Sequence, residues 1–305
     1  MLTFYDLSAG DFDRLSPILY RAGCAGADTG FHNMYFWDCY YGQAGEVCGM
    51  ITQHITQDGR EVYLCPVGDG DLKEAIEQLH QDAKERGGAF RLRGVTPDRR
   101  EALERLFPEQ FIFTPYRDSF DYIYTVEELT ELHGKKLQSK RNHCNRFAAE
   151  HPYYRTVPVT SETVELCRKM AEEWYAVHES SEQIEQEKTA LARAFASFAQ
   201  TKMDGLLLME GERVLAFSLG AQLNERYYDV CFEKAFSSIN GAYAVINREF
   251  ARMIAEKYPT VEFLNREDDM GEPGLRRAKE SYQPTLLLEK YFADWREDAS
   301  CGIKD

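Results

Sequence analysis

The sequence lacks any run of about 18 uncharged apolar residues, the length that a helix needs to cross a membrane. Its apolar runs, such as Leu206 to Met209 and Leu286 to Leu288, have the length of strands. The opening residues, Met1 to Asp6, lack the basic flank and apolar segment of a signal peptide. We therefore expect no transmembrane segment and a cytoplasmic location.

Positive charge is also scarce. The 305 residues include 36 Lys and Arg against 51 Asp and Glu, which gives a net charge of −15. This balance excludes a generally basic nucleic-acid coat, and no DNA partner is expected. Because 44% of the residues are hydrophobic and 13% aromatic, the chain can build a packed interior. A chain of this length suggests two domains.

Several chemical signatures are missing as well. The eight cysteines are never closer than nine residues apart, so no C-x-x-C pair exists, and we expect reduced thiols and no metal site. The sequence has no G-x-S-x-G, Walker A or H-E-x-x-H motif and no G-x-G-x-x-G opening a helix. Serine hydrolase, P-loop NTPase and zincin functions therefore lose their usual support.

The predicted elements follow one order twice. In the first half a hairpin (46–54 and 60–65) precedes a helix from 72, a strand 89–95, a helix from 97 and strand material 111–124. In the second half strands 206–209, 214–221 and 226–232 precede a helix from about 241, a strand 261–265, a helix 273–281 and a strand 285–291. Matching elements lie about 170 residues apart. We predict an α/β (α+β) protein with two tandem domains, 1–125 and 126–295, and a tail 296–305.

An antiparallel meander followed by helix, strand, helix and strand is the order of the GNAT acyltransferase fold, a mixed central sheet flanked by helices. In that fold the helix after the meander directs its N-terminal N–H groups at a pyrophosphate. The candidate cofactor-binding residues at that corner are Ser238, Asn240, Gly241 and Ala242. The usual Q/R-x-x-G-x-G/A signature is absent, so coenzyme A binding and an ordinary capped helix both remain open. The matching corner of the first copy, 67–71, holds two carboxylates, which predicts a structural or substrate-covering role for that copy.

The segment from Leu132 to Ala149 has five Lys or Arg and no carboxylate. It is either a solvated helix face or an anion site that grips tRNA, a phospholipid headgroup or a nucleotide. The candidate anion-binding residues are Lys135, Lys136, Lys140 and Arg141. Gly30 to Trp37 is densely aromatic and is typical of packing, although His32 and Asn33 could reach a cleft between the copies.

A polar cluster follows the predicted strand 261–264, and ligands of α/β sheets commonly lie at strand ends. Glu267, Asp268 or Asp269 could be a general base, and Tyr282 could act as an acid or orient a substrate. Asn265, Arg266, Arg277 and Lys279 are candidates for binding the substrate or stabilising charge. The alternative is an ion-paired entry to the helix 273–281.

Three motifs together resemble the bacterial phosphatidylglycerol lysyltransferase C-terminal-domain family. They are Asp121-Tyr122-Ile123-Tyr124 with Leu129, the run Gly134-Lys135-Lys136 to Lys140-Arg141-Asn142 ending in Phe147, and Asn265 to Gly271 with Gly274-Leu275-Arg276, Lys279, Tyr282 and Pro284. The resemblance implies a tandem GNAT fold related to the Fem-type aminoacyl transferases. Membrane-embedded members transfer lysine from lysyl-tRNA to phosphatidylglycerol, and we expect this chain to belong with the short members that lack the membrane domain.

The resemblance and the motifs predict a transferase that moves an acyl or aminoacyl group to an amine or hydroxyl by direct attack. Acyl-CoA or aminoacyl-tRNA would be the donor, with no permanently bound cofactor, and the acceptor could bear a phosphate. Glu267, Asp269 and Tyr282 are the predicted catalytic residues. The alternative is a non-catalytic GNAT-fold protein that binds a nucleotide, RNA or a phospholipid headgroup.

Overall fold

The computed structural model describes residues 1–178 and 180–296 and contains two mixed sheets flanked by helices. The first sheet has the strand order β1-β2-β3-β4-β13-β5, and β3 runs parallel to β4. Its strands are β1 (Gln43–Val47), β2 (Met50–Gln57), β3 (Arg60–Leu64), β4 (Ala89–Val95), β5 (Phe111–Pro115) and β13 (Tyr291–Trp295). Helices α4 (Leu72–Arg86) and α5 (Pro97–Leu106) connect its strands, and α1 (Phe12–Arg21), α2 (Phe31–Phe36) and α3 (Asp38–Tyr41) precede them.

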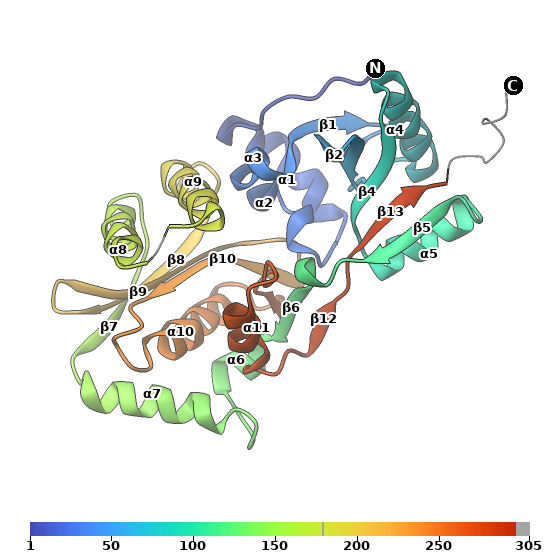
Figure 1. The fold of residues 1–305 in the computed structure, drawn as a ribbon. Helices are drawn as coiled ribbons and strands as arrows, with labels where there is room; N and C mark the ends of the chain where they lie inside the picture. Colours follow the sequence, from blue (N-terminus) through green and yellow to red (C-terminus); the bar gives the residue numbers. More distant parts are fainter. Residues whose placement is uncertain (179, 297–305) are drawn as a thin grey trace, which may run out of the picture.

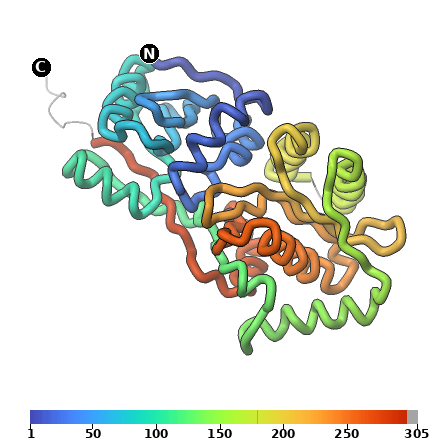
Figure 2. The backbone as a smooth tube through the Cα atoms, turned by 180° about the vertical axis from the view of Figure 1, so that it is seen from behind, coloured from blue at the N-terminus to red at the C-terminus, as the bar shows by residue number. Residues whose placement is uncertain are grey.

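The second sheet has the strand order β12-β6-β11-β10-β9-β8-β7, and β10 runs parallel to β11. Its strands are β6 (Asp121–Thr125), β7 (Tyr154–Pro158), β8 (Asp204–Glu210), β9 (Arg213–Gln222), β10 (Tyr227–Ala235), β11 (Phe263–Asn265) and β12 (Leu286–Leu288). Figures 1 and 2 show one helix pair, α8 (Val164–Ala176) and α9 (Glu182–Ser197), on one side of this sheet. On the other side lie α6 (Val126–Glu131), α7 (Gln138–Glu150) and α10 (Ala242–Lys257), and α11 (Pro273–Glu280) precedes β12.

The predicted repeat is confirmed, because meander, helix, strand, helix and strand occur in both halves. Local signals explain many of the boundaries. Asp71 accepts a hydrogen bond from the Glu74 amide at the start of α4, and Ser181 does the same for Ile184 at the start of α9. The expected strand 46–54 is wrong in one respect, since a turn at Cys48 and Gly49, both with positive φ, separates β1 from β2.

The two halves exchange strands. β6 lies before the expected boundary at 125/126 but pairs with β11 and β12 in the second sheet. β13 follows the second copy in sequence yet inserts between β4 and β5 of the first sheet (Figure 1). The division between the sheets therefore does not follow the predicted domain boundary. The expected tail 296–305 lies outside the described residues apart from Arg296.

The halves also pack against each other through α2. Gly30 precedes this helix at a close approach, where an added Cβ would lie 2.5 Å from Leu223. The His32 ring nitrogen lies 2.8 Å from the Thr201 carbonyl oxygen, and Phe36 packs in the core beneath α8 and α9. The first half thus reaches the second sheet. No helix within 1–178 or 180–296 is both long and apolar enough to cross a bilayer.

Candidate functional site

A cavity of about 940 Å³ opens beside the second sheet. Its floor is β10, whose pairing with β9 is interrupted between Asp229 and Phe232 by a bulge-like register shift. The start of α10, the loop 266–270 and α11 form further walls. Trp37 from the first half, Trp174 from α8 and the start of α9 complete the lining. Both halves therefore contribute to this cleft.

Glu267 lies in the cleft wall with a left-handed backbone (φ 55°). Its amide donates to Asn265 Oδ1 at 2.7 Å, and its Oε1 accepts a hydrogen bond from Asn33 Nδ2 at 3.2 Å. Burial raises the pKa of Glu267 well above its ordinary value, and the negative charge of Asp229 raises it further. A carboxyl group with a raised pKa holds a proton more firmly than an exposed one and can exchange it with a bound substrate.

Asn265 is fully buried behind this wall. Its side-chain amide donates to Asp121 Oδ2 at 2.8 Å and to the Ala25 carbonyl at 2.9 Å, while its oxygen accepts from Glu267 N. All of these contacts are internal to the protein. The geometry therefore makes Asn265 a positioning residue for the Glu267 loop, not the substrate-binding residue that the motif predicted.

The two aspartates next to Glu267 differ. Asp268 lines the cleft, and burial raises its pKa to about 6. Asp269 is fully buried and binds Arg276 at 2.8 Å, Arg117 at 3.0 Å and the Tyr122 hydroxyl at 2.6 Å. Burial would raise its pKa, but these hydrogen bonds outweigh it and hold the pKa at about 2. Asp269 is thus a poor proton acceptor and links α11 to the first half.

Tyr282 lies at the cleft with 5% of its surface exposed, and two cations lie close to its ring. Lys140 Nζ lies 4.0 Å from the ring centroid, and the Arg266 guanidinium lies 4.8 Å from it. Arg266 also donates to Glu233 at 3.0 Å. Lys140 forms no ion pair with the part of the chain that the structure describes, and burial lowers its pKa. Lys140 is therefore available to an anionic ligand.

The other predicted cations lie elsewhere or have internal partners. Lys135 and Lys136 are exposed in the turn before α7, and Arg277 is exposed on α11. Arg141 donates to the carbonyl oxygens of Leu132 and Gly134, which stabilises the end of α6. Lys279 lines the cleft and donates to the carbonyl oxygens of Arg266 and Asp268, so it holds the Glu267 loop in place.

The predicted helix corner also reaches the cleft. Asn240 and Gly241 line it, whereas Ser238 is exposed beside it and Ala242 is buried in the core. Gly241 has φ 87°, and an added Cβ would lie 2.5 Å from the His143 carbonyl oxygen. Position 241 therefore needs a glycine for packing as well as for backbone freedom. Binding of coenzyme A there stays a prediction.

Sequence reasoning missed the polar residues of β10. Asp229 is 1% exposed, and Cys231, Glu233 and Lys234 line the cleft. Lys234 is buried, pairs with Glu187 at 2.7 Å and lies 3.8 Å from the Trp174 ring centroid. Charged residues in the central strand of a sheet are costly unless they have partners or a function. The charged residues of this strand were therefore the sequence signal that could have revealed this part of the site.

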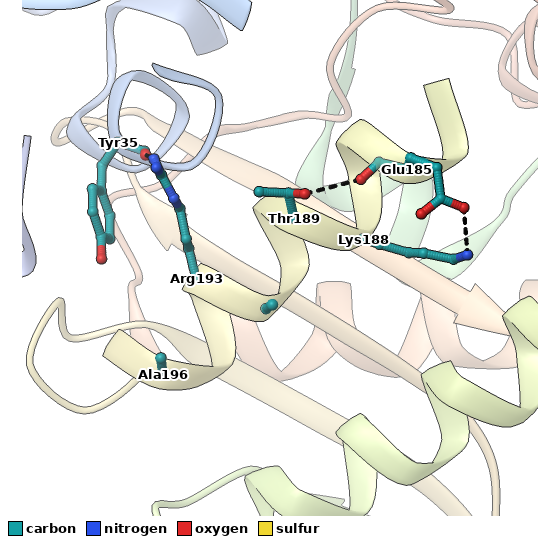
Figure 3. A pocket seen from close by; sticks show the side chains of 7 residues that line it. Tyr35, Glu185, Lys188, Thr189, Arg193 and Ala196 are labelled. Atoms are coloured by element: carbon teal, nitrogen blue, oxygen red, sulfur yellow. Dashed lines mark hydrogen bonds and ion pairs between the residues drawn. The ribbon is translucent and has the colours of Figure 1, made fainter. Parts of the chain in front are cut away.

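A second hollow lies between α2 and α9 (Figure 3). Arg193 crosses it to the Tyr35 carbonyl oxygen at 2.8 Å and pairs with Asp38, and Lys188 pairs with Glu185 at 2.7 Å. The charged groups of this hollow are paired within the protein. The hollow therefore belongs to the contact between the two halves.

The fold is that of the GNAT-like transferases, built twice in tandem. Residues 25–294 match the family described as phosphatidylglycerol lysyltransferase, C-terminal, and the chain belongs to that family. The resemblance in the motifs is thereby confirmed.

Three relatives illustrate the range of similarity. A conserved protein of unknown function from Bacteroides thetaiotaomicron is 36% identical, with a TM-score of 0.90 over 97% of this chain and 100% of that one. The C-terminal domain (DUF2156) assigned to a lysylphosphatidylglycerol synthetase of Agrobacterium fabrum shares the fold, with 15% identity and a TM-score of 0.68 over 95% and 93% of the chains. An uncharacterised protein of Mycoplasmoides gallisepticum is 24% identical over 182 residues, or 58% of this chain. The chain spans 56% of the length of that curated relative.

Proposed function

We propose that the chain transfers an aminoacyl or acyl group from an aminoacyl-tRNA or a thioester donor to an amine or hydroxyl by direct attack. The observation that supports this most is Glu267, a buried carboxyl group in the wall of a cleft that also contains the start of α10. The family is described by an aminoacyl transfer, which favours aminoacyl-tRNA as the donor. The donor is a substrate here and not a resident cofactor.

The roles follow from the positions of the side chains. Glu267 takes a proton from the attacking group, because its raised pKa makes it a stronger base than an exposed carboxylate. The Tyr282 hydroxyl donates to the oxyanion that develops on the acyl carbon, and Lys140 and Arg266, which lie 4.0 and 4.8 Å from the centroid of the Tyr282 ring, add positive charge nearby. The start of α10 and Lys140 offer N–H donors and positive charge to the donor phosphates. An acceptor substrate that bears a phosphate would bind to the same groups, Lys140 and the start of α10.

A transfer assay tests this proposal. The purified chain is incubated with tRNA charged with a mixture of radiolabelled amino acids, or with labelled acetyl-CoA, in the presence of primary amines or phospholipid vesicles. We expect one donor to lose its labelled group faster in the presence of the protein than by spontaneous hydrolysis. The label should then be recovered on an acceptor substrate. Because general-base catalysis contributes about 10²–10⁴-fold, Glu267→Gln should slow transfer at least about 100-fold.

The matched control is Glu256→Gln, which removes an exposed carboxylate near the end of α10, away from the cleft. Its transfer rate should stay within about twofold of the wild type, since exposed charges act weakly through water. If neither donor is consumed, the proposal is refuted. Tight binding of RNA or a nucleotide without turnover would favour a binding protein instead.

A further inference from the structure

Asp229 and Glu267 lie where two parallel strands separate. β10 pairs with β11 through three residues, and the last of these pairs joins Asp229 to Asn265. Beyond Asp229 the register of β10 against β9 also shifts. The loop that follows Asn265 carries Glu267 in the cleft wall. The point at which the two strands separate therefore brings Asp229 next to Glu267.

The two carboxyl groups are close together and have weak partners. One oxygen of Asp229, one oxygen of Glu267 and Cys231 Sγ all lie within 4.8 Å of one another. Cys231 Sγ donates to Asp229 Oδ2 at 3.5 Å, and Asn33 Nδ2 donates to Glu267 Oε1 at 3.2 Å. Two carboxyl groups at this separation in a buried place cannot titrate independently.

We propose that Asp229 is a positioning residue for Glu267, whose negative charge lies behind the cleft wall and strengthens Glu267 as the base of the transfer. Asp229 is buried and is not among the described residues that line the cleft, so it acts through Glu267 and not on the substrate. This role rests on the proposed function, whereas the coupling of the two carboxyl groups does not.

Charged groups from four surrounding segments face the pair. They are Asp121 of β6, Asp268 of the loop after β11, Lys279 of α11 and Lys290 before β13. The two lysines donate their hydrogen bonds elsewhere, Lys279 to backbone carbonyl oxygens and Lys290 to Asp121. The lysines therefore act on the pair through their charge, across a buried region in which charges interact strongly.

These surroundings favour the first negative charge on Asp229. Burial and the charge of Asp121 raise the pKa of Asp229, whereas the Cys231 thiol and the two lysines oppose the rise. Burial raises the pKa of Glu267 as well, and the charge of Asp229 is the largest further contribution in the same direction. As the pH rises, Asp229 therefore ionises first, and Glu267 holds its proton against that charge.

The consequence for transfer is a stronger base. Ionised Glu267 accepts the proton of the attacking hydroxyl or amine while the bond from that oxygen or nitrogen to the acyl carbon forms. The C–O bond of a tRNA ester or the C–S bond of a thioester breaks, and the proton passes to the departing oxygen or sulfur, so Glu267 returns to its ionised form. The charge of Asp229 increases the proton affinity of Glu267 in the first of these steps.

The test is a carbon-13 NMR titration of the whole chain, without donor or acceptor substrate and in the presence of EDTA. Glutamate labelled at the side-chain carboxyl carbon reports Glu267, whose signal is assigned by its loss in Glu267→Gln. In Asp229→Asn the titration midpoint of Glu267 should fall by at least about one pH unit, because a neutral amide replaces the charge. Glu256→Gln, the exposed control, should shift it by less than about 0.3 pH unit.

The variant Asn33→Leu separates the effect of charge from that of loosened packing. Asn33 donates to Glu267 and favours its ionised form, so this variant should raise the midpoint. Water admitted by loosened packing would lower the midpoint in both variants, because it relieves the effect of burial. Opposite shifts support the inference, and a fall in both variants or no shift in Asp229→Asn overturns it. If Asp229→Asn does not fold, the wild-type curve decides, since the Glu267 signal titrates in two steps if the groups are coupled and in one if they are not.

The transfer assay keeps this inference apart from the proposed function. Transfer should weaken as the pH falls through the Glu267 midpoint. In Asp229→Asn this fall should move to lower pH by the same amount, with KM within about twofold, because Asp229 does not touch the substrate. The NMR shift without consumption of a donor would refute the transferase and leave the coupled pair standing. Transfer without the NMR shift would support the transferase and overturn the role of Asp229.

Discussion

The carboxylate of Asp269 allows a sharp test of the electrostatics behind the site. It is fully buried and binds Arg276, Arg117 and the Tyr122 hydroxyl, and Gly271 N donates to it at 3.0 Å. Asp269→Asn keeps the shape of the side chain and removes its charge. The variant leaves two guanidinium groups without their buried partner, so it should destabilise the protein.

The magnitude follows from the pKa of Asp269, which falls from 3.8 to about 2 on folding. A shift of this size corresponds to about 2.4 kcal/mol of stability at neutral pH. Because the folded pKa is the lower one, this stability is fully present above about pH 4 and is lost as the pH falls through about 2. We expect Asp269→Asn to cost at least about 2 kcal/mol at pH 7 and progressively less toward pH 3.

Urea denaturation from pH 7 to pH 3 measures this difference. The control is Asp118→Asn, which also removes a partner of Arg276 at 2.8 Å, but from a side chain that is 44% exposed. Its free energy of unfolding should change by less than about 1 kcal/mol, because water screens the pair. Equal losses in the two variants, or a loss for Asp269→Asn that does not shrink in acid, would refute the reasoning.

Three further predictions concern local structure and binding. Gly241→Ala should lower stability by at least about 1–2 kcal/mol, because φ is positive and the new Cβ would meet the His143 carbonyl oxygen; an unchanged melting temperature would contradict this. Thr125→Ala removes the side-chain oxygen that caps α6 at 3.2 Å and should cost about 1 kcal/mol in urea unfolding. Lys140→Gln should weaken binding of a tRNA probe and reduce the slope of log affinity against log salt by about one, and an unaltered slope would exclude Lys140 as a phosphate contact.

The fold was predictable to the extent that it depends on local signals. The order of elements repeats at a spacing of about 170 residues. The signals for the single elements, such as hydrophobic periodicity and the capping box of Thr125 and Glu128, lie within short windows of sequence. No such short window indicates the exchange of strands between the two sheets. β6 pairs with β11, about 140 residues away, through Ile123 and Asn265, and β13 returns to β4 and β5. Such pairing depends on which sheet edge is free, and no local pattern records that.

The candidate site was also predictable only where its residues belong to local motifs. Glu267, Tyr282 and Lys140 were found because they belong to motifs, and the structure brings all three to one cleft. Asp229 was missed because its strand, which also carries Glu233 and Lys234, was identified only by its strand-forming residues, and that pattern does not say which charged residues lie at a cleft. Asn33 was named as able to reach a cleft, but its partner could not be, since 234 residues separate it from Glu267.

The motif 265–269 shows why residue type alone does not assign a role. Within five residues, Asn265 holds the loop, Glu267 lines the cleft, and Asp269 is neutralised by guanidinium groups. The same carboxyl chemistry thus acquires a raised pKa at Glu267 and a lowered one at Asp269, according to burial and partners. Since Asn33 and Arg117 come from the first half, that half sets both environments, so it takes part in the site that the second half carries. A role limited to covering the substrate would not place a side chain of the first half in a hydrogen bond with Glu267, the general base that we propose.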